Sequence, residues 1–143
     1  MTSCLDLREE GKTKSGIYEL QFGEEKKNVF CDMSTLGGGW TVIQRRGDFG
    51  NPADFFLRNW TEYRNGFGRA DRELWMGLEY MFLLSNVESV QMLINLEDFD
   101  GNRTAILVNE FRIANEDSGY RIFYKNFSSP LGRSLPAKGT KFR

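Results

Sequence analysis

The chain has 143 residues, of which 40% are hydrophobic, 27% charged and 14% aromatic. This length and composition indicate one globular domain with a core rich in large rings, and they exclude a disordered chain. Lys and Arg number 19 and Asp and Glu number 20, so the net charge of −1 provides no general attraction to nucleic acid or anionic membranes.

No apolar run approaches the roughly 18 residues that a membrane-spanning helix needs, so membrane insertion is not expected. The first six residues, Met-Thr-Ser-Cys-Leu-Asp, have neither the basic start nor the apolar run of a signal peptide. We therefore expect a trimmed or truncated chain, with a cytosolic protein as the alternative.

The two cysteines are Cys4 and Cys31, and the chain has no histidine. A metal site would need more ligands than these. A disulfide between them would close a loop of about 28 residues, which is worth about 3–4 kcal/mol in the chain-entropy model. Two buried free thiols are the alternative that the residues alone leave open.

The first part of the chain predicts a hairpin. Residues 16–22 alternate between apolar and polar side chains, as a half-buried strand does. A charged turn at 23–28 and a second strand at 29–33 complete the hairpin. The three glycines at 37–39 predict a turn with positive φ, and residues 40–46 predict a further strand.

The middle of the chain predicts two helices. The first covers residues 54–63, with Pro52 just upstream and Gly66 after its end. Its apolar face would consist of Phe55, Phe56, Trp60 and Tyr63. Residues 78–84 predict a second, short helix.

Strands follow at 90–96, 105–113 and 120–124, and Asp100-Gly101 is a hairpin signal between the first two. After Lys125 the chain is expected to be loop-like. Antiparallel hairpins mixed with short helices indicate an α+β fold.

No enzyme activity is expected. Without histidine, a Ser-His or Cys-His pair cannot form in this chain. The carboxylate pairs Asp98/Asp100 and Glu116/Asp117 are predicted to be solvated residues of turns and strand ends. The segment that begins at Asp98 does not fit an EF-hand, because its glycine falls at loop position 4 rather than 6.

The glycine run, the basic pairs and the aromatic spacing predict structural roles rather than a phosphate or nucleic-acid site. The triple glycine is not followed by the Gly-Lys-Ser/Thr of a phosphate loop. The basic pairs Lys26-Lys27 and Arg45-Arg46 are predicted to be solvated. The aromatic residues follow strand and helix periods rather than the spacing of a nucleic-acid stacking platform, so no nucleic-acid partner is expected.

Three Asn-X-Ser/Thr sequons begin at Asn59, Asn102 and Asn126. All three are candidate glycosylation sites. Asn102 and Asn126 lie at predicted turns, which fits surface glycans. Asn59 lies in the predicted helix beside Trp60, a position that disfavours modification.

Several motifs occur in one order along most of the chain. They are Ser-Gly-Ile-Tyr at 15–18, Val-Phe-Cys-Asp-Met at 29–33, Gly-Gly-Gly-Trp-Thr-Val-Ile-Gln-Arg-Arg at 37–46, the Asp-Phe to Gly-Phe-Gly stretch at 54–68, Glu-Leu-Trp-Met-Gly-Leu at 73–78 and Asp-Phe-Asp-Gly at 98–101. In this order they resemble the fibrinogen-like C-terminal domain family, which includes ficolin- and tachylectin-like lectins. One extra Phe between Phe55 and Arg58 departs from the family pattern.

The resemblance implies a single partial domain over residues 1–143, with a Cys4–Cys31 disulfide. Residues 1–36 would form a small, disulfide-stapled β-hairpin subdomain. Residues 37–143 would form a central twisted antiparallel sheet with short flanking helices. The C-terminal ligand-binding subdomain would be absent, so no metal or cofactor is expected in this chain, and calcium is expected only where that subdomain is present. The segment at 136–142 departs from the His-Asn-Gly-x-x-Phe stretch common in lectin members.

The implied function is secreted recognition of the lectin type, with binding of acetylated glycans or pathogen surfaces in innate immunity. The alternative is a non-lectin adhesive or structural module that acts in clotting, matrix or receptor binding. The partners would be glycans or extracellular and cell-surface proteins. Homo-oligomers would assemble through an upstream segment.

Overall fold

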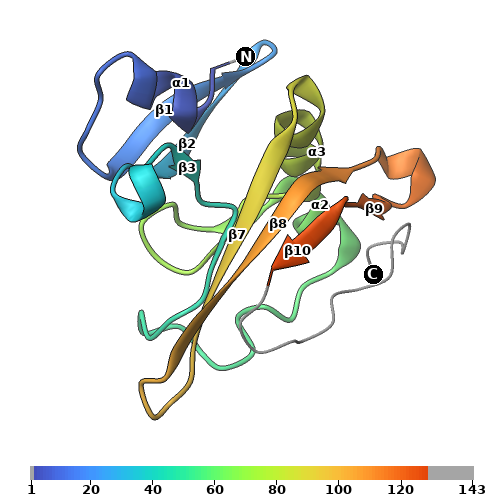
Figure 1. Ribbon diagram of the computed structural model, residues 1–143. Coiled ribbons are helices and arrows are strands. Elements are labelled where there is room, and N and C mark those ends of the chain that lie inside the picture. Colours follow the sequence, from blue (N-terminus) through green and yellow to red (C-terminus); the bar gives the residue numbers. More distant parts are fainter. Residues whose placement is uncertain (1, 129–143) are drawn as a thin grey trace. The chain divides into compact units, whose positions relative to one another are not determined.

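The computed structural model describes residues 2–128 of the chain, in two compact units, Met1–Met81 and Phe82–Arg143 (Figure 1). Short helices and antiparallel sheets make up both units, so the expected α+β fold is confirmed. The expected division into residues 1–36 and 37–143 remains a prediction.

The first unit begins with a three-stranded antiparallel sheet in the order β1-β2-β3. Its elements are α1 (Cys4–Glu9), β1 (Gly16–Phe22), β2 (Glu25–Asp32), the short 3-10 helix η1 (Thr35–Gly37) and β3 (Trp40–Thr41). The predicted strand at 16–22 is confirmed. Strand β2 starts four residues earlier than expected, because Phe22 pairs with Glu25 across a two-residue turn. The charged residues after the turn therefore belong to the hairpin ladder.

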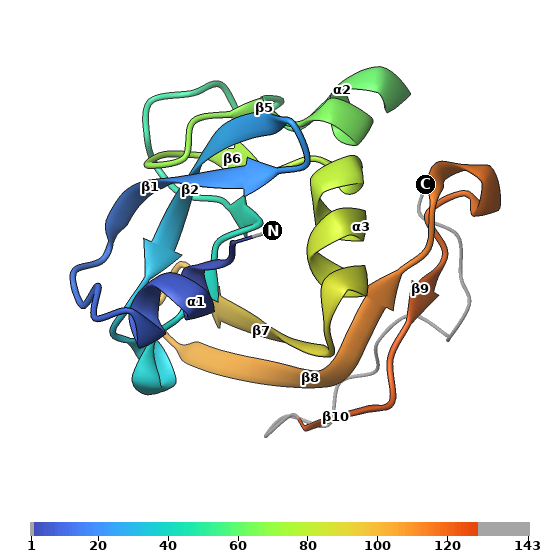
Figure 2. The ribbon, with the colours of Figure 1, turned by 90° about the horizontal axis from the view of Figure 1, so that it is seen from above.

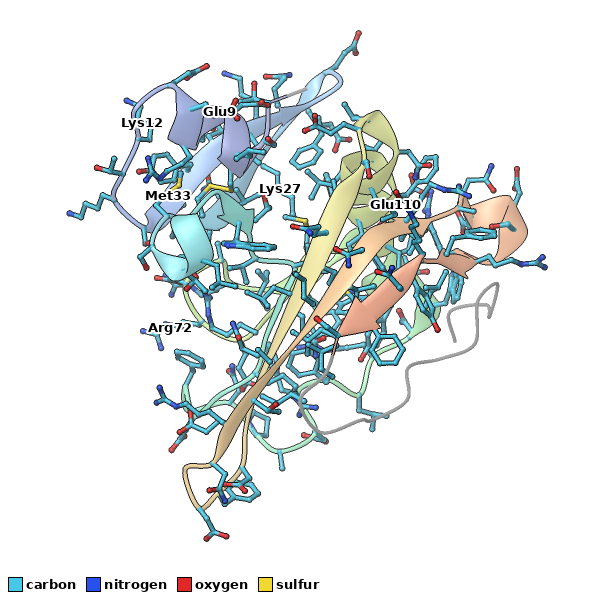
Figure 3. All side chains as sticks on the ribbon, viewed as in Figure 1. Glu9, Lys12, Lys27, Met33, Arg72 and Glu110 are labelled. Atoms are coloured by element: carbon cyan, nitrogen blue, oxygen red, sulfur yellow. A yellow bond between two sulfur atoms is a disulfide. The ribbon has the colours of Figure 1, made fainter. Side chains whose placement is uncertain are left out.

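A disulfide joins Cys4 of α1 to Cys31 of β2, with both side chains fully buried (Figure 3, yellow bond). The start of α1 is a capping box. Ser3 Oγ accepts a hydrogen bond from the backbone N–H of Asp6, and the Asp6 carboxylate accepts one from the N–H of Ser3. This cap orients the first turn of the helix and so positions Cys4 against the sheet.

The glycine run after η1 turns as predicted, with positive φ at each of its three residues. Glycine is required at Gly38, where a Cβ would lie 2.2 Å from the carbonyl oxygen of Met33. The close approach of these two backbone segments leads the chain directly into β3, beside β2.

The rest of the first unit contains a second small sheet in the order β4-β6-β5. Its elements are β4 (Gln44–Arg45), α2 (Trp60–Asn65), β5 (Phe67–Gly68) and β6 (Leu74–Trp75). The strand predicted at 40–46 is divided, because Trp40 and Thr41 pair with β2 whereas Gln44 and Arg45 pair with β6. The chain changes sheets between these pairs.

The helix predicted at 54–63 is wrong in position. The preceding residues form turns, in which Phe55 N–H donates to the Pro52 carbonyl and Leu57 N–H to the Asp54 carbonyl. Helix α2 begins only after Asn59, whose side chain accepts a hydrogen bond from Glu62 N–H at 2.9 Å. Trp60, expected on an apolar face, is 43% exposed.

The aromatic residues of this segment nevertheless pack together. Phe55, Phe56, Tyr63, Phe67 and Trp75 form edge-to-face pairs with ring centroids 5.1–5.9 Å apart. The Arg58 guanidinium lies 4.6 Å from the ring centroids of Phe55 and of Phe67. The cluster stabilises irregular backbone that has few ladder hydrogen bonds of its own.

The second unit is organised around a long antiparallel hairpin (Figure 2). Helix α3 (Leu78–Val87) begins at the end of the first unit and leads into the hairpin. The other elements of the second unit are β7 (Val90–Glu97), β8 (Arg103–Ile113), the 3-10 helix η2 (Glu116–Ser118), β9 (Ile122–Phe123) and β10 (Asn126–Ser128). The strand order is β10-β8-β7, with β9 also paired to β8. The second helix and the strands predicted at 90–96 and 105–113 are confirmed, each slightly longer than expected.

The third strand predicted here is shorter than expected, and β10 falls where a loop was expected. Tyr120, with a positive φ and a fully buried side chain, ends a tight turn before β9. The remainder of the predicted loop-like tail, including the segment at 136–142, lies outside the described residues.

Two side-chain hydrogen bonds attach the end of α3 to β8. Ser85 Oγ accepts from Ile113 N–H at 3.1 Å, and Asn86 Nδ2 donates to the Ile113 carbonyl at 2.7 Å. The buried side chains of β8 are Ile106, Val108, Phe111 and Ile113. The hairpin is therefore anchored at one end, while its turn extends into solvent.

Candidate functional site

A β-bulge interrupts the pairing of β7 and β8. Met92 pairs with Val108 and Val90 with Phe111, so Gln91 opposes two residues, Asn109 and Glu110. Glu110 has φ +51°, a left-handed conformation that is uncommon outside glycine. The extra residue turns neighbouring polar side chains toward one another on the surface of the sheet.

The bulge supports a chain of amide side chains across three strands. Gln91 Nε2 donates to Asn109 Oδ1 at 2.8 Å, and Asn109 Nδ2 donates to Asn126 Oδ1 at 2.7 Å. Asn126 lies directly opposite Asn109 in the β8–β10 ladder. The pairing register therefore aligns these polar groups.

An ion pair lies beside the amides, with Lys125 Nζ 3.8 Å from Glu110 Oε1. Both side chains are more than half exposed, so the pair contributes at most about 1 kcal/mol to stability. Figure 3 shows Glu110 on β8. Together the bulge residues line an open depression of about 340 Å³, formed by Ser89, Val90, Gln91, Asn109, Glu110, Lys125 and Asn126.

We call this set the bulge depression. Its side chains offer amide donors and acceptors, one carboxylate and one ammonium group. Such a surface fits a ligand rich in hydroxyl and amide groups better than an apolar one. No pattern in the sequence predicted this depression. The available signal was the consecutive polar pair Asn109-Glu110, which breaks the apolar alternation of the strand.

The carboxylates considered as catalytic candidates lie elsewhere. Asp98 and Asp100 are exposed at the turn between β7 and β8, and Glu116 and Asp117 begin η2. Hydrogen bonds from the Asn102 side chain and from the backbone of the turn lower the pKa of Asp98. Its carboxylate therefore organises the turn. The prediction that the protein is not an enzyme stays a prediction.

The three sequon asparagines are exposed or partly exposed in different settings. Asn59 is the N-cap of α2, Asn102 ends the β7–β8 turn, and Asn126 starts β10 within the bulge depression. Asn59, predicted within a helix, is instead the N-cap of α2. Asn126, predicted in a turn, instead lies in strand β10.

Of the two arginines at the end of the predicted strand, Arg46 is exposed as expected, whereas Arg45 is partly buried. Arg45 Nη1 donates to the carbonyls of Ala70 and Arg72 at 2.7 and 3.1 Å, and its guanidinium stacks on Phe30. Burial lowers the pKa of Arg45. Arg46 stacks on Phe56, with its guanidinium 4.4 Å from the ring centroid. Both arginines therefore have structural contacts.

Within residues 2–128, no group of three or more Asp, Glu, His or Cys side chains is arranged to hold a metal ion. None of the helices in the same range is long and apolar enough to cross a bilayer. The expectations of no metal and no membrane insertion for the chain stay predictions.

Comparison with known proteins explains this architecture. The profile of "Fibrinogen beta and gamma chains, C-terminal globular domain" matches residues 1–143, and the chain belongs to this family. It is 37% identical over 138 residues to Techylectin-5A of Tachypleus tridentatus, an alignment that covers 94% of this chain and 47% of the relative. It is 40% identical over 143 residues to mouse angiopoietin-1, an alignment that covers 97% of this chain and 28% of the relative.

Solved structures show the same fold. The fibrinogen-like globe domain of human ANGPTL6 superposes with a TM-score of 0.91 at 34% identity, covering 99% of this chain and 63% of that chain. A lamprey fibrin D-dimer complexed with the peptide Gly-His-Arg-Pro-amide gives a TM-score of 0.78 at 30% identity, covering 88% of this chain and 41% of that one. The sequence thus spans less than two thirds of these proteins.

Proposed function

We propose that this chain is part of an extracellular recognition protein of the lectin type, which binds acetylated glycans on cell or pathogen surfaces. Membership of the fibrinogen-like family together with the 37% identity to Techylectin-5A, a lectin by name, carries this proposal. The buried Cys4–Cys31 disulfide supports an oxidising compartment.

The proposal assigns the calcium-dependent acetyl-sugar site to the part of a fibrinogen-like domain that this sequence does not cover. The test is retention of the full-length natural chain on a resin bearing N-acetylated sugars, in the presence of calcium. Retention that is lost on chelation and not seen on a non-acetylated resin is expected. Retention of the 143-residue segment alone would contradict the proposed location of the site.

Within the described residues, the bulge depression would supply additional polar contacts to a bound glycan. Asn109→Ala removes the central amide group, which hydrogen-bonds to both Gln91 and Asn126, so we expect sugar affinity to fall about 5–10-fold. Asn95→Ala, an exposed amide on β7 outside the depression, is the matched control. Equal affinities measured for the two variants by titration calorimetry would exclude the depression as a contact surface.

A second candidate function is non-lectin adhesion or receptor binding. The 40% identity to mouse angiopoietin-1 favours it, as does the peptide bound in the related lamprey fibrin structure. Enzymatic removal of cell-surface glycans separates the two functions. Cell binding of the labelled full-length chain should be lost if it is a lectin and kept if its receptor is a protein.

The finer features of this proposal are glycosylation at Asn59, Asn102 or Asn126 and homo-oligomers assembled through an upstream segment. Multivalency would raise the avidity of weak single-site sugar binding. Intact mass of the native secreted protein, before and after glycan removal, tests the first feature. Light scattering of the same sample tests the second. Any hydrolytic activity abolished by Asp98→Asn would contradict a purely binding role.

A further inference from the structure

Phe99 is the most exposed large apolar side chain among the described residues. It lies in the turn between β7 and β8, and its relative exposure of 112% means that the ring is open to solvent on all sides. Figure 1 shows this turn at the far end of the hairpin, away from β9 and β10. A single exposed apolar residue is ordinary. An exposed ring on a hydrogen-bonded turn leaves its ring faces available for packing.

The turn is held by a network centred on Asp98. The Asp98 Oδ1 atom accepts hydrogen bonds from the backbone N–H groups of Asp100 and Asn102, both at 2.9 Å. Backbone bonds also link Asp98 N–H to the Asn102 carbonyl and Gly101 N–H to the Asp98 carbonyl. Phe99 and Asn102, three residues apart, are thereby fixed on one tight turn.

Asn102 is the first residue of a sequon that Thr104 completes, so a threonine hydroxyl lies at the required position. The Asn102 side chain is exposed, and its Nδ2 donates to Asp98 Oδ2 at 2.8 Å. A glycosylated amide nitrogen keeps one hydrogen. The bond to Asp98 can therefore persist after modification and orient the sugar that replaces the other hydrogen.

We propose that Asn102 carries an N-linked glycan whose first N-acetylglucosamine packs its apolar face on the ring of Phe99. The inference rests on the proposed passage of the chain through the secretory pathway. There, the amide nitrogen of Asn102 bonds to C1 of a lipid-diphosphate-linked N-acetylglucosamine. The C1–oxygen bond to the diphosphate breaks, the lipid diphosphate leaves, and the amide loses one proton.

The electronic structure of the two groups favours this packing. One face of the pyranose carries axial C–H bonds with slight positive charge, and the face of a phenyl ring is its negative region. A three-residue separation across a tight turn allows a side chain and a sugar on the same side to meet. The sugar would cover a ring that is otherwise fully solvated, which stabilises the glycosylated hairpin.

A double-mutant cycle on the full-length natural chain secreted from animal cells tests the inference. The four proteins are the natural chain, Phe99→Ala, Asn102→Gln and the double variant. An endoglycosidase trims all glycans to their first N-acetylglucosamine before melting. Asn102→Gln should lower Tm by about 2–5 °C when Phe99 is present and by much less when it is alanine. Val87→Ala, another exposed apolar position, should show no such coupling to Asn102.

Occupancy of each sequon by mass spectrometry distinguishes the possible failures. Glycan at Asn102 together with the Tm coupling supports the inference. Glycan only at Asn59 or Asn126 overturns it while leaving the extracellular proposal intact, and no glycan at any sequon overturns both. An occupied Asn102 without coupling overturns the packing and leaves the Phe99 ring available to a protein partner.

Discussion

At the scale of single residues, short polar side chains hold the turns of this protein. Asp32, at the end of β2, accepts hydrogen bonds from the backbone N–H groups of Ser34 and Thr35, both at 3.0 Å, and from the Thr35 hydroxyl at 2.6 Å. Burial by itself would raise the pKa of Asp32. The hydrogen bonds from Thr35 and Ser34 outweigh it, so the pKa is lowered.

A lowered carboxyl pKa predicts acid sensitivity. The stabilisation from Asp32 is present above its ordinary pKa of 3.8 and is lost as pH falls from there through the folded-state value. We expect Asp32→Asn to lower the free energy of unfolding at pH 7 by about 1–2 kcal/mol, and to lessen its decline below pH 4. Urea titrations at several pH values measure both. Asp48→Asn, at an exposed position, should keep the slope of the unmodified chain.

The second residue-scale prediction concerns Gly68. A Cβ at this position would lie 2.1 Å from the carbonyl oxygen of Glu73, and its φ is +88°. Because β5 and β6 must approach this closely, Gly68→Ala should destabilise the chain by about 2 kcal/mol or more. Gly50→Ala is the control, since its φ is also +88° but no atom lies within 4 Å of the position that its methyl group would take. A chemical denaturation midpoint equal for both variants would contradict the steric argument.

At the scale of elements, the bulge in β8 explains how one strand keeps its apolar face. Buried side chains occur at Ile106 and Val108, and then at Phe111 and Ile113, so the alternation shifts by one residue. The extra residue at Glu110 restores the phase. The strand itself could be predicted from its apolar pattern. The bulge could not be predicted in the same way, because it depends on the register with β7.

The left-handed backbone at Glu110 predicts a clear residue preference. Glu110→Gly should change the free energy of unfolding by less than about 1 kcal/mol, because glycine adopts φ +51° without strain. Glu110→Val should cost about 1–2 kcal/mol, since a β-branched residue strongly disfavours this region. Glu97→Val, at an exposed strand residue, is the control and should leave the free energy of unfolding nearly unchanged. Equal free energies of unfolding for Glu110→Val and Glu110→Gly would contradict a left-handed backbone at this position.

Helix α2 shows why the boundaries of elements are harder to predict than their existence. The aromatic spacing at 54–63 fits a helical face, yet these rings pack through turns and short strands. The Asn59 cap and the Arg58–Glu62 ion pair, at 2.8 Å, favour a later start. The periodic spacing of the aromatic residues therefore predicted that they pack together, but not the turns and short strands of the backbone from which they extend.

At the scale of the whole molecule, the chain is a family fold assembled from many short elements. Several of its strands have only two residues, so they depend on tertiary contacts rather than on their own ladders. The covalent link between α1 and β2 is one such contact. It connects the N-terminal helix to a strand 27 residues further along the chain.

Removal of this link should be costly. We expect Cys4→Ser with Cys31→Ser to lower the free energy of unfolding by about 3–4 kcal/mol, because the open loop regains conformational entropy in the unfolded state. Thermal unfolding monitored by circular dichroism measures the loss. The oxidised chain treated with a reductant should approach the double variant. Unchanged melting after complete reduction would show that the packing around α1 suffices.

The sequence by itself determined the features that depend on residues close together along the chain. These are the alternation of β1, β7 and β8, the glycine turn at 37–39 and the ordered motifs of the family, since each depends on near neighbours along the chain. The pairing of the two cysteines was left open by the residues and came from the family resemblance.

Only the tertiary structure decided how distant segments meet. It divided the strand at 40–46 between two sheets and directed the Arg45 guanidinium to the carbonyls of Ala70 and Arg72. It also aligned Gln91, Asn109 and Asn126 across three strands. Each of these outcomes depends on the register between segments far apart in sequence. The local sequence pattern of one segment does not specify which residues of a distant segment it pairs with. These contacts can therefore be identified only from the paired strands.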